Sequence, residues 1–436
     1  KDALTLWAPH LCQRSKARRH HLCKHPTVQR HLTPSGRCKA MEASASPECE
    51  RSSRSLDAAK NRELREALLM LNLGSSEAKD GCRCNTGRSR SRCVSVRGED
   101  DRRDAVTLSS PRKTHERKIG VSDFSTIKVI GRGSFGKVSL VRKITSGALF
   151  AMKVLKKDEI VAQKQVQHTQ TERRILSAIS HPFIVRLHYA FQTAEKLYFV
   201  LDYAAGGELF FHLSRLGRLP EAAVRFYCAE LVLALEALHL HGIIYRDLKP
   251  ENIMLDAEGH VKLVDFGLCK EGVHSPTEGA SSLCGTAEYF APEVLDRRGH
   301  GQAADWWNLG MVAYEMLTGL PPWYTPNTKL LFRSIRYEPL RPPRYMGARA
   351  VSLVESLLTK DPHQRLGSGP DRAQEVQQHA FFQGVDWPLL LARSVTPPLH
   401  PTRGQGELDA RNFEKEFTDM CISVDWQGGQ GGQGQG

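Results

Sequence analysis

Three polar side chains with complementary chemistry stand close together in the sequence, and a fourth follows a short apolar run. Asp247, Lys249 and Asn252 lie on one loop, and Asp265 begins an Asp-Phe-Gly triplet. Phosphoryl transfer needs a carboxylate to orient the attacking hydroxyl, a cation beside the transferring phosphate and oxygen ligands for Mg²⁺. Asp247 and Lys249 fit the first two needs, and Asn252 and Asp265 fit the third. A lone loop aspartate is usually a turn residue, but this ordered set predicts phosphoryl-transfer chemistry.

A glycine-rich segment upstream predicts a cover for the phosphates. Gly131, Gly133 and Gly136 satisfy G-x-G-x-x-G, a pattern that dinucleotide-binding and P-loop sites share in part. Both of those sites require a helix directly after the glycines. Here the strand-like runs 138–141 and 150–155 follow, separated by a turn. The pattern therefore predicts a β-hairpin flap, whose glycines let the backbone approach phosphates closely.

A lysine and a glutamate are predicted to face the same cleft. Period two places Ala151 and Lys153 on one face of the second hairpin strand, where the ammonium can reach phosphates and the small residue leaves room for adenine. Glu172 precedes Ile175 and Leu176 by three and four residues, so it lies on the apolar side of a helix. We therefore expect an ion pair between Lys153 and Glu172.

The elements that must position these residues divide the 436-residue chain into four parts. Residues 1–118 form a basic leader, predicted to be largely disordered apart from a helical pattern at 56–73. Residues 124–382 have a β-rich front and a helical back, which predicts an α+β catalytic domain. An extended segment, 383–426, and a Gln/Gly-rich tail, 427–436, complete the chain.

Composition limits the class of protein. The formal charge is +13, yet residues 1–40 hold nine Lys and Arg against one acidic residue, and residues 1–118 lack the interleaved aromatics of a nucleic-acid module. We expect no nucleic-acid partner. No apolar run reaches membrane-spanning length and no secretory signal precedes the domain, so we expect a cytoplasmic or nuclear protein. The cysteine spacing predicts no disulfide framework and does not favour a zinc site.

The segments that carry the chemistry resemble the signature set of protein kinases. They are Gly131–Val138, Ala151–Lys153, Tyr245–Asn252, Asp265–Gly267, Ala291–Glu293 and Asp305–Gly310. The resemblance covers roughly residues 124–425. It implies a bilobal fold with a small β-rich N-lobe and a larger, mainly helical C-lobe, and ATP with Mg²⁺ as cofactors. A pseudokinase would lack Lys153, Asp247 or Asp265, and all three are present.

Tyr245 in place of the usual histidine, with the segments 267–271 and 284–289, resembles the AGC group, which phosphorylates Ser and Thr. The segments 365–370 and 412–418 are most similar to the ribosomal S-six kinase branch. The run Lys196 to Tyr203 equally suits the glucocorticoid-induced kinase and protein-kinase-B relatives.

The resemblance implies a role for each matching residue. The catalytic set comprises Asp247, Lys249, Lys153, Glu172 and Thr286, and the metal ligands are Asn252 and Asp265. The nucleotide-binding residues are Ile130, Gly131, Arg132, Gly133, Ser134, Phe135, Gly136, Lys137, Val138, Ala151 and Lys153, with Leu201 as gatekeeper and Asp202 and Ala204 at the adenine hinge. Glu208 and Glu251 match positions that bind upstream arginines of substrates. An ion pair between Glu293 and Arg365 is expected as scaffold.

Regulation is also implied. Ser282 occupies the activation-loop phosphosite, where a phosphate is expected to reach Arg246 and His168, so we expect an upstream activating kinase. We expect a monomer that acts on proteins with upstream arginines. Ser95 is a candidate autophosphorylation site. The segment after Thr418 shows no Ser-Pro and no Phe-x-x-Phe pattern, so the groove beside the Glu172 helix is expected to be empty unless Trp426 fills it.

Overall fold

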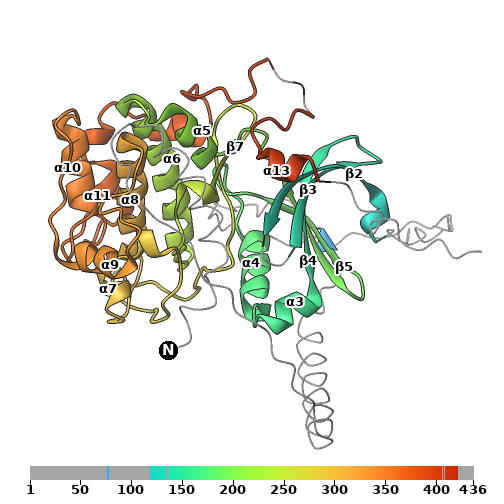
Figure 1. Cartoon of the computed structure of the whole chain (residues 1–436), viewed down its shortest axis with the longest axis horizontal. Coiled ribbons are helices and arrows are strands. Elements are labelled where there is room, and N and C mark those ends of the chain that lie inside the picture. Colours follow the sequence, from blue (N-terminus) through green and yellow to red (C-terminus); the bar gives the residue numbers. More distant parts are fainter. Residues whose placement is uncertain (1–75, 78–117, 134–135, 405, 407, 421–436) are drawn as a thin grey trace, which may run out of the picture. The chain divides into compact units, whose positions relative to one another are not determined.

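The computed structural model describes residues 76–77, 118–133, 136–404, 406 and 408–420 (Figure 1). The chain divides into residues 1–59 and 60–436, and every described residue belongs to the second unit. The described ranges do not include the helical pattern at 56–73, Ser95, Trp426 or the leader cysteines considered for zinc.

An antiparallel sheet forms the small lobe, in the order β1-β5-β6-β4-β3-β2. Its strands are β1 (Ser76–Glu77), β2 (Phe124–Gly133), β3 (Gly136–Lys143), β4 (Leu149–Lys156), β5 (Leu187–Gln192) and β6 (Lys196–Asp202). The predicted hairpin is β3 and β4. Both strands run further than expected, β3 where it pairs with β2 and β4 where it pairs with β3 and β6. Met152 and Val154 pack with Phe124 on one face of the sheet, whereas Ala151 packs with Ile130 on the other. This alternation turns Ala151 and Lys153 toward the second lobe, as period two predicts.

Two helices follow the hairpin, α3 (Lys157–Ala162) and α4 (Val166–Ala178). The buried residues of α4 are Thr169, Glu172, Ile175 and Leu176, which share one face. Figure 1 shows α4 beside the sheet, between β4 and the larger lobe. The glutamate therefore lies on the buried side of its helix, as its spacing to the apolar residues predicts.

The larger lobe is mainly helical. Its helices are α5 (Leu209–Leu216), α6 (Glu221–Leu240), α7 (Pro292–Leu295), α8 (Ala303–Thr318), α9 (Thr328–Tyr337), α10 (Ala348–Leu357) and α11 (Ala373–Gln377). Most residues of α6 and α8 are buried, and these two helices form the centre of the main hydrophobic core. A small sheet of β7 (Gly207–Glu208), β8 (Ile253–Leu255) and β9 (Val261–Leu263) carries the catalytic segments. This architecture confirms the predicted α+β bilobal fold.

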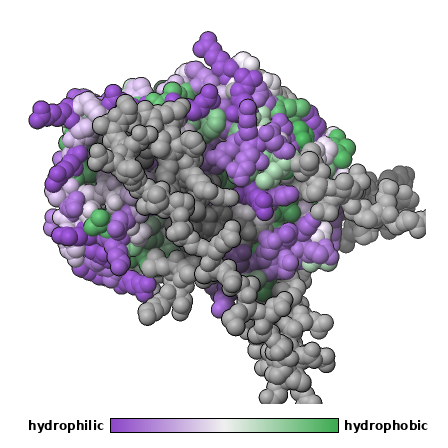
Figure 2. Space-filling view, in the orientation of Figure 1, coloured by the Kyte–Doolittle hydropathy of each residue, from purple (hydrophilic) through white to green (hydrophobic). Residues whose placement is uncertain are grey.

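The segment after residue 382 returns to the small lobe. It contains α12 (Trp387–Leu391) and α13 (Lys415–Thr418), and α13 lies against β2 (Figure 1). The visible surface of the described residues is mostly hydrophilic, with separate small apolar areas (Figure 2). None of the helices in the described ranges is long and apolar enough to span a bilayer.

Candidate active site

Three of the predicted site residues surround the carboxylate of Asp247, which lies on the loop between α6 and β8. The Lys249 ammonium donates to Asp247 Oδ2 at 2.8 Å, and the Thr286 hydroxyl donates to Asp247 Oδ1 at 2.9 Å. The Asn252 amide donates to the same carboxylate at 2.9 Å and to the Asp247 carbonyl at 2.8 Å. Lys249 also donates to the Thr286 hydroxyl at 2.7 Å. The carboxylate is thus held on both oxygens, which fixes its direction.

A buried carboxylate on α8 holds this loop in place. Asp305 accepts hydrogen bonds from the amides of Tyr245 and Arg246, at 2.9 and 2.7 Å, and contacts His239 Nε2 at 2.8 Å. Arg246 has φ of 72°, a conformation rarely adopted by a residue with a side chain. The hydrogen bonds that the two backbone amides donate to Asp305 compensate for that strain. Asp305 appeared in the sequence only as part of a signature segment, and its bond to the loop was not predicted.

The expected ion pair bridges the sheet and α4. Lys153 Nζ lies 2.6 and 2.9 Å from the two oxygens of Glu172, and 3.9 Å from Asp265 Oδ1. Burial by itself would lower the pKa of Lys153, but the charges of Glu172 and Asp265 outweigh it and leave the pKa raised. The ammonium therefore stays charged and lies next to the Asp-Phe-Gly carboxylate.

Two oxygen-bearing side chains are placed where the sequence expects a metal. Asp265 lies two residues after the end of β9, and its side chain is 57% exposed. Asn252 is buried in the loop beside Asp247. Carboxylate and amide oxygens are hard donors that suit Mg²⁺ when phosphates supply further ligands. Across the described residues, no three His, Cys, Asp or Glu side chains form a metal-binding group by themselves. The donor set therefore fits a cation that is shared with phosphates.

The glycine-rich turn joins β2 to β3, with Ser134 and Phe135 outside the described residues. Nothing lies within 4 Å of the position that a Cβ on Gly133 would take, so the space beside this residue is open. Glycine is required at position 136 for a different reason: a Cβ there would lie 1.7 Å from the Val154 carbonyl oxygen of β4. Close strand packing therefore requires Gly136, independently of any ligand. Arg132 and Lys137 face each other across the strand pair.

An apolar wall forms where the adenine is expected. Ile130, Ala151 and Val138, which are expected to bind the nucleotide, belong to one apolar cluster. Residues that the sequence reasoning did not assign to this site complete the wall, and they are Leu140, Tyr203, Met254, Ala410 and Phe413. The ring of Phe413 stacks on Tyr203 with centroids 6.1 Å apart. Phe413 belongs to the segment 412–418, whose resemblance to relatives could have indicated that an aromatic ring joins this wall.

The Asp202 side chain holds the hinge after β6 in place through several contacts. The Asp202 carboxylate contacts His188 Nε2 at 2.7 Å and accepts from Lys262 at 3.0 Å and from the Arg186 amide at 3.1 Å. Burial would raise its pKa, but the bonds to His188 and Lys262 lower it to about 2. The side chain of Asp202 is therefore occupied, and any role in binding adenine falls to its backbone. Leu201 pairs with Ala151 across the sheet.

The C-terminal segment crosses the hinge and the turn after β8. Asn412 donates to the carbonyls of Ala205 and Pro401, at 3.1 and 3.0 Å. Gly207 has φ of 74°, and a Cβ there would lie 2.3 Å from the Asn412 carbonyl oxygen. Arg393 forms ion pairs with Asp256 and with Glu258, the latter at 3.3 Å. These contacts hold the segment that carries Phe413 against the site.

The two expected substrate carboxylates lie on neighbouring elements. Glu208 pairs with Met254 between β7 and β8 and precedes α5, and Glu251 lies in the turn just before β8. The structure thus brings both to the same edge of the small sheet.

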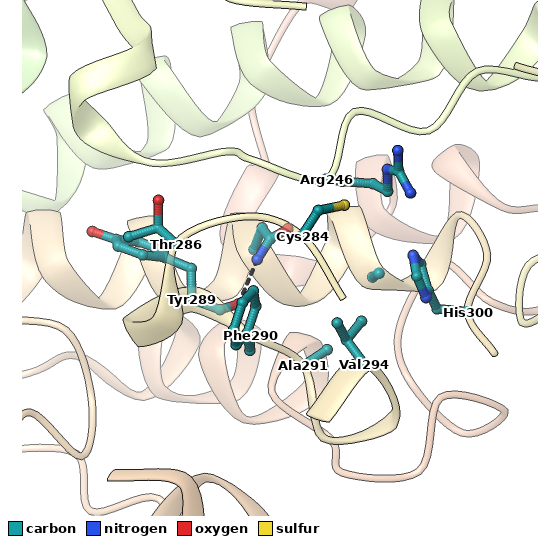
Figure 3. A pocket seen from close by; sticks show the side chains of 10 residues that line it. Arg246, Cys284, Thr286, Tyr289, Phe290, Ala291, Val294 and His300 are labelled. Atoms are coloured by element: carbon teal, nitrogen blue, oxygen red, sulfur yellow. Dashed lines mark hydrogen bonds between the residues drawn. The ribbon is translucent and has the colours of Figure 1, made fainter. Parts of the chain in front are cut away.

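The predicted activation-loop serine meets one of its two expected partners. Arg246 donates to Ser282 Oγ at 2.7 Å and to the carbonyl oxygens of Leu268 and Cys269. His168 on α4 lies near Gly267, and burial, with the charge of Arg246, lowers its pKa. A small cavity lies behind this loop, and Figure 3 shows Arg246, Cys284 and His300 around it.

The scaffold prediction agrees with the structure. Arg365 donates to both oxygens of Glu293, at 2.6 and 2.9 Å, and both side chains are buried.

The Lys153–Glu172 pair lies in the small lobe, and the hydrogen-bonded Asp247 lies in the large lobe. Together with the two-lobed fold, they define a catalytic domain of the protein kinase type. The chain matches the protein kinase domain model over residues 124–382. It therefore belongs to the protein kinase family, as expected from its motifs.

Three relatives show where it stands within that family. The RAC family serine/threonine-protein kinase homolog of Dictyostelium discoideum is 48% identical over 318 residues, which cover 73% of this chain and 70% of that protein. RAC-beta serine/threonine-protein kinase A of Xenopus laevis is 50% identical to this chain. RAC-beta serine/threonine-protein kinase of Homo sapiens is 48% identical to it. Both alignments cover 309 residues, 70% of this chain and 63% of the relative, so the chain spans less than two thirds of these two proteins. These names agree with an AGC-type kinase, and the narrower likeness to the ribosomal S-six branch stays a prediction.

Proposed function

We propose that this chain is a serine/threonine protein kinase that transfers the γ-phosphoryl group of Mg-ATP to protein hydroxyls. The observation that carries the proposal is the convergence of the Lys153–Glu172 pair with Asp265, whose charge also acts on Asp247. Asp247 orients the attacking hydroxyl and takes its proton, as the new P–O bond forms and the bond to the ADP oxygen breaks. Lys153 positions the phosphates and Lys249 balances the charge of the transferring group.

Magnesium would supply charge neutralisation of the phosphates, held by Asn252 and Asp265. The apolar wall around Ala151 would bind adenine, and Gly133 leaves space for phosphate oxygens. Lys153, Asp247 and Asp265 contribute charge or orientation mainly in the transition state, which raises turnover more than affinity, whereas the apolar wall contributes to affinity.

Loss of the Asp265 carboxylate tests this mechanism. Asp265→Ala should lower turnover by roughly a thousandfold in a radiolabelled ATP assay, because the metal loses its carboxylate. The exposed Asp371→Ala serves as the matched control and should keep wild-type turnover. Near-normal turnover in Asp265→Ala would remove the mechanism. A wild-type protein that binds ATP but transfers no phosphate would favour the alternative, a kinase-fold scaffold.

The finer parts of the function are further proposals. Protein substrates carry arginines upstream of the phosphoacceptor, because Glu208 and Glu251 offer carboxylates at one edge of the cleft. An upstream kinase activates the enzyme at Ser282. We also propose that it acts as a monomer in the cytoplasm or nucleus.

A further inference from the structure

Arginine side chains gather at one surface of the large lobe, where the end of α5 meets the loop before α10. We define this arginine patch by six exposed residues: Arg215, Leu216, Arg218, Arg341, Arg344 and Tyr345. The Arg218 guanidinium lies over the Tyr345 ring, 4.2 Å from its centroid. Nearby, the Gly347 amide donates to Glu221 Oε1 at 2.6 Å, and the Tyr314 hydroxyl donates to the Arg341 carbonyl at 3.3 Å. The Arg218–Tyr345 and Glu221–Gly347 contacts therefore join the two segments, and Tyr314 of α8 holds the loop before α10.

Two of these arginines are held in place by aromatic rings. Arg215 lies over Phe211, 5.2 Å from the ring centroid, and Arg218 lies over Tyr345. Gly217 ends α5 with φ of 78°, which directs the chain from one arginine to the other. Among the described residues no carboxylate lies within ion-pair distance of either guanidinium, and the adjacent Glu221 is engaged by the Gly347 amide. Both arginines thus keep their N–H groups available at little further entropic cost.

The composition of the patch indicates the chemistry of a partner. It holds arginines and no lysine, and planar guanidinium groups match carboxylate and phosphate oxygens in pairs. Leu216 and Tyr345 remain 55% and 57% exposed beside them. Arg and Tyr are enriched in the centres of protein interfaces, and arginine clusters recognise acidic or phosphorylated segments. We propose that the arginine patch docks an acidic segment of a protein partner, with an apolar side chain that packs on Leu216 and Tyr345.

The position of the patch relates this docking to substrate choice. The carboxylate expected to bind substrate arginines, Glu208, directly precedes α5, and Arg215 lies in its last turn. A helix of this length spans about 12 Å. One protein can therefore present arginines to the cleft and an acidic segment to the patch.

Binding of a short fluorescein-labelled peptide of Glu residues with one Tyr and one Leu tests the proposal by anisotropy. The full chain should bind it, and binding should weaken as salt rises. Arg218→Ala and Arg344→Ala should each lower affinity by about tenfold or more, because each removes a charge-assisted contact. Arg218→Lys should lose affinity too, because it keeps the charge but not the planar group. Arg403→Ala, an exposed arginine outside the patch, is the matched control.

Thermal unfolding of each variant verifies the fold, and Arg218→Ala should keep wild-type turnover on a short Arg-rich peptide. No binding by the wild-type chain, or equal binding by all variants, would overturn the proposal. Vesicles of phosphatidylcholine with phosphatidylserine form the second arm. Patch-dependent vesicle binding without peptide binding would also overturn it, in favour of a membrane surface.

Discussion

At the scale of single residues, Asp247 is surrounded by groups that act on its pKa in opposite directions. Burial raises the pKa of this carboxyl, whereas Lys249 and the Thr286 hydroxyl lower it, and the net result is a raised pKa. Lys249 shows the complementary case: burial lowers its pKa, but Asp247 and Glu251 more than offset this. The pair is therefore charged when the carboxyl has lost its proton.

The balance at Asp247 predicts the acid limb of the pH–rate profile. Activity requires the ionised carboxylate, so it falls as pH drops through a pKa that lies above the ordinary value for Asp. Thr286→Ala removes a hydrogen bond to the charged form, and the acid limb should move to higher pH. Profiles of kcat/KM measure this, and Thr286→Ser should restore the wild-type limb. An unmoved limb in Thr286→Ala would contradict the assignment.

Glu208 offers a prediction on specificity. Glu208→Ala should raise KM for Arg-rich peptides by about 10- to 100-fold, the range for a lost charge-assisted bond, with kcat little changed. A peptide without upstream arginine should be unaffected, since it makes no such bond. Steady-state kinetics with the two peptides separates the cases. An equal loss on both would indicate that Glu208 only supports the start of α5.

At the scale of elements, the activation loop, the catalytic loop and α4 meet around Arg246. Its guanidinium already reaches Ser282 and the backbone after the Asp-Phe-Gly triplet. Arg174 of α4 also pairs with Glu271 of the same loop at 2.5 Å. A change of charge at Ser282 therefore acts on a junction of three elements.

Phosphorylation of Ser282 should activate the enzyme severalfold. The added charge strengthens the contact with Arg246, and it raises the pKa of His168, which burial and Arg246 now keep low. A protonated His168 could then hold α4, and with it the Lys153–Glu172 pair. Turnover after treatment with an upstream kinase measures this. Ser282→Ala should lose the activation and the neighbouring Ser281→Ala should keep it; full activation of Ser282→Ala would refute the mechanism.

Spacing in the sequence predicted the local parts of this site, the family resemblance added some distant pairs such as Glu293 with Arg365, and other distant contacts were missed. Asp247, Lys249 and Asn252 stand within one loop, so their spacing constrains their geometry, and the residue types identify the chemistry. The bond from Asp305 to that loop joins positions 59 residues apart, and the contact of Phe413 with Tyr203 joins the C-terminal segment to the hinge. Such contacts depend on topology, which periodicity does not determine. The need for glycine at position 136 could not be predicted from the sequence either, because it arises from close packing against β4.

At the scale of the whole molecule, the buried Glu293–Arg365 pair joins the end of the activation segment to the far part of the large lobe. Arg365 also donates to the Thr359 and Ala303 carbonyls, at 3.0 and 2.8 Å, and its side chain is fully buried. Removal of one partner leaves a buried charge uncompensated, which costs several kcal/mol.

Arg365→Met should therefore lower the free energy of unfolding by about 3–5 kcal/mol. Arg298→Ala is the control: Arg298 is exposed in its ion pair with Asp296, and the loss should stay within about 1 kcal/mol. Denaturant unfolding measures both. The double variant Glu293→Gln with Arg365→Met should recover part of the loss, and no recovery would show that the carbonyl contacts of Arg365 dominate.

The return of the C-terminal segment to the hinge has a consequence for biosynthesis. The ribosome releases residues 124–382 before the stretch that carries Asn412 and Phe413, and domains tend to fold as they emerge. A nascent chain can therefore hold both lobes and the catalytic loop while the wall around Ala151 still lacks Phe413 and Ala410. Ligands stabilise only the states that bind them. Nucleotide should therefore protect the finished protein from unfolding far better than it protects the same domain still attached to the ribosome.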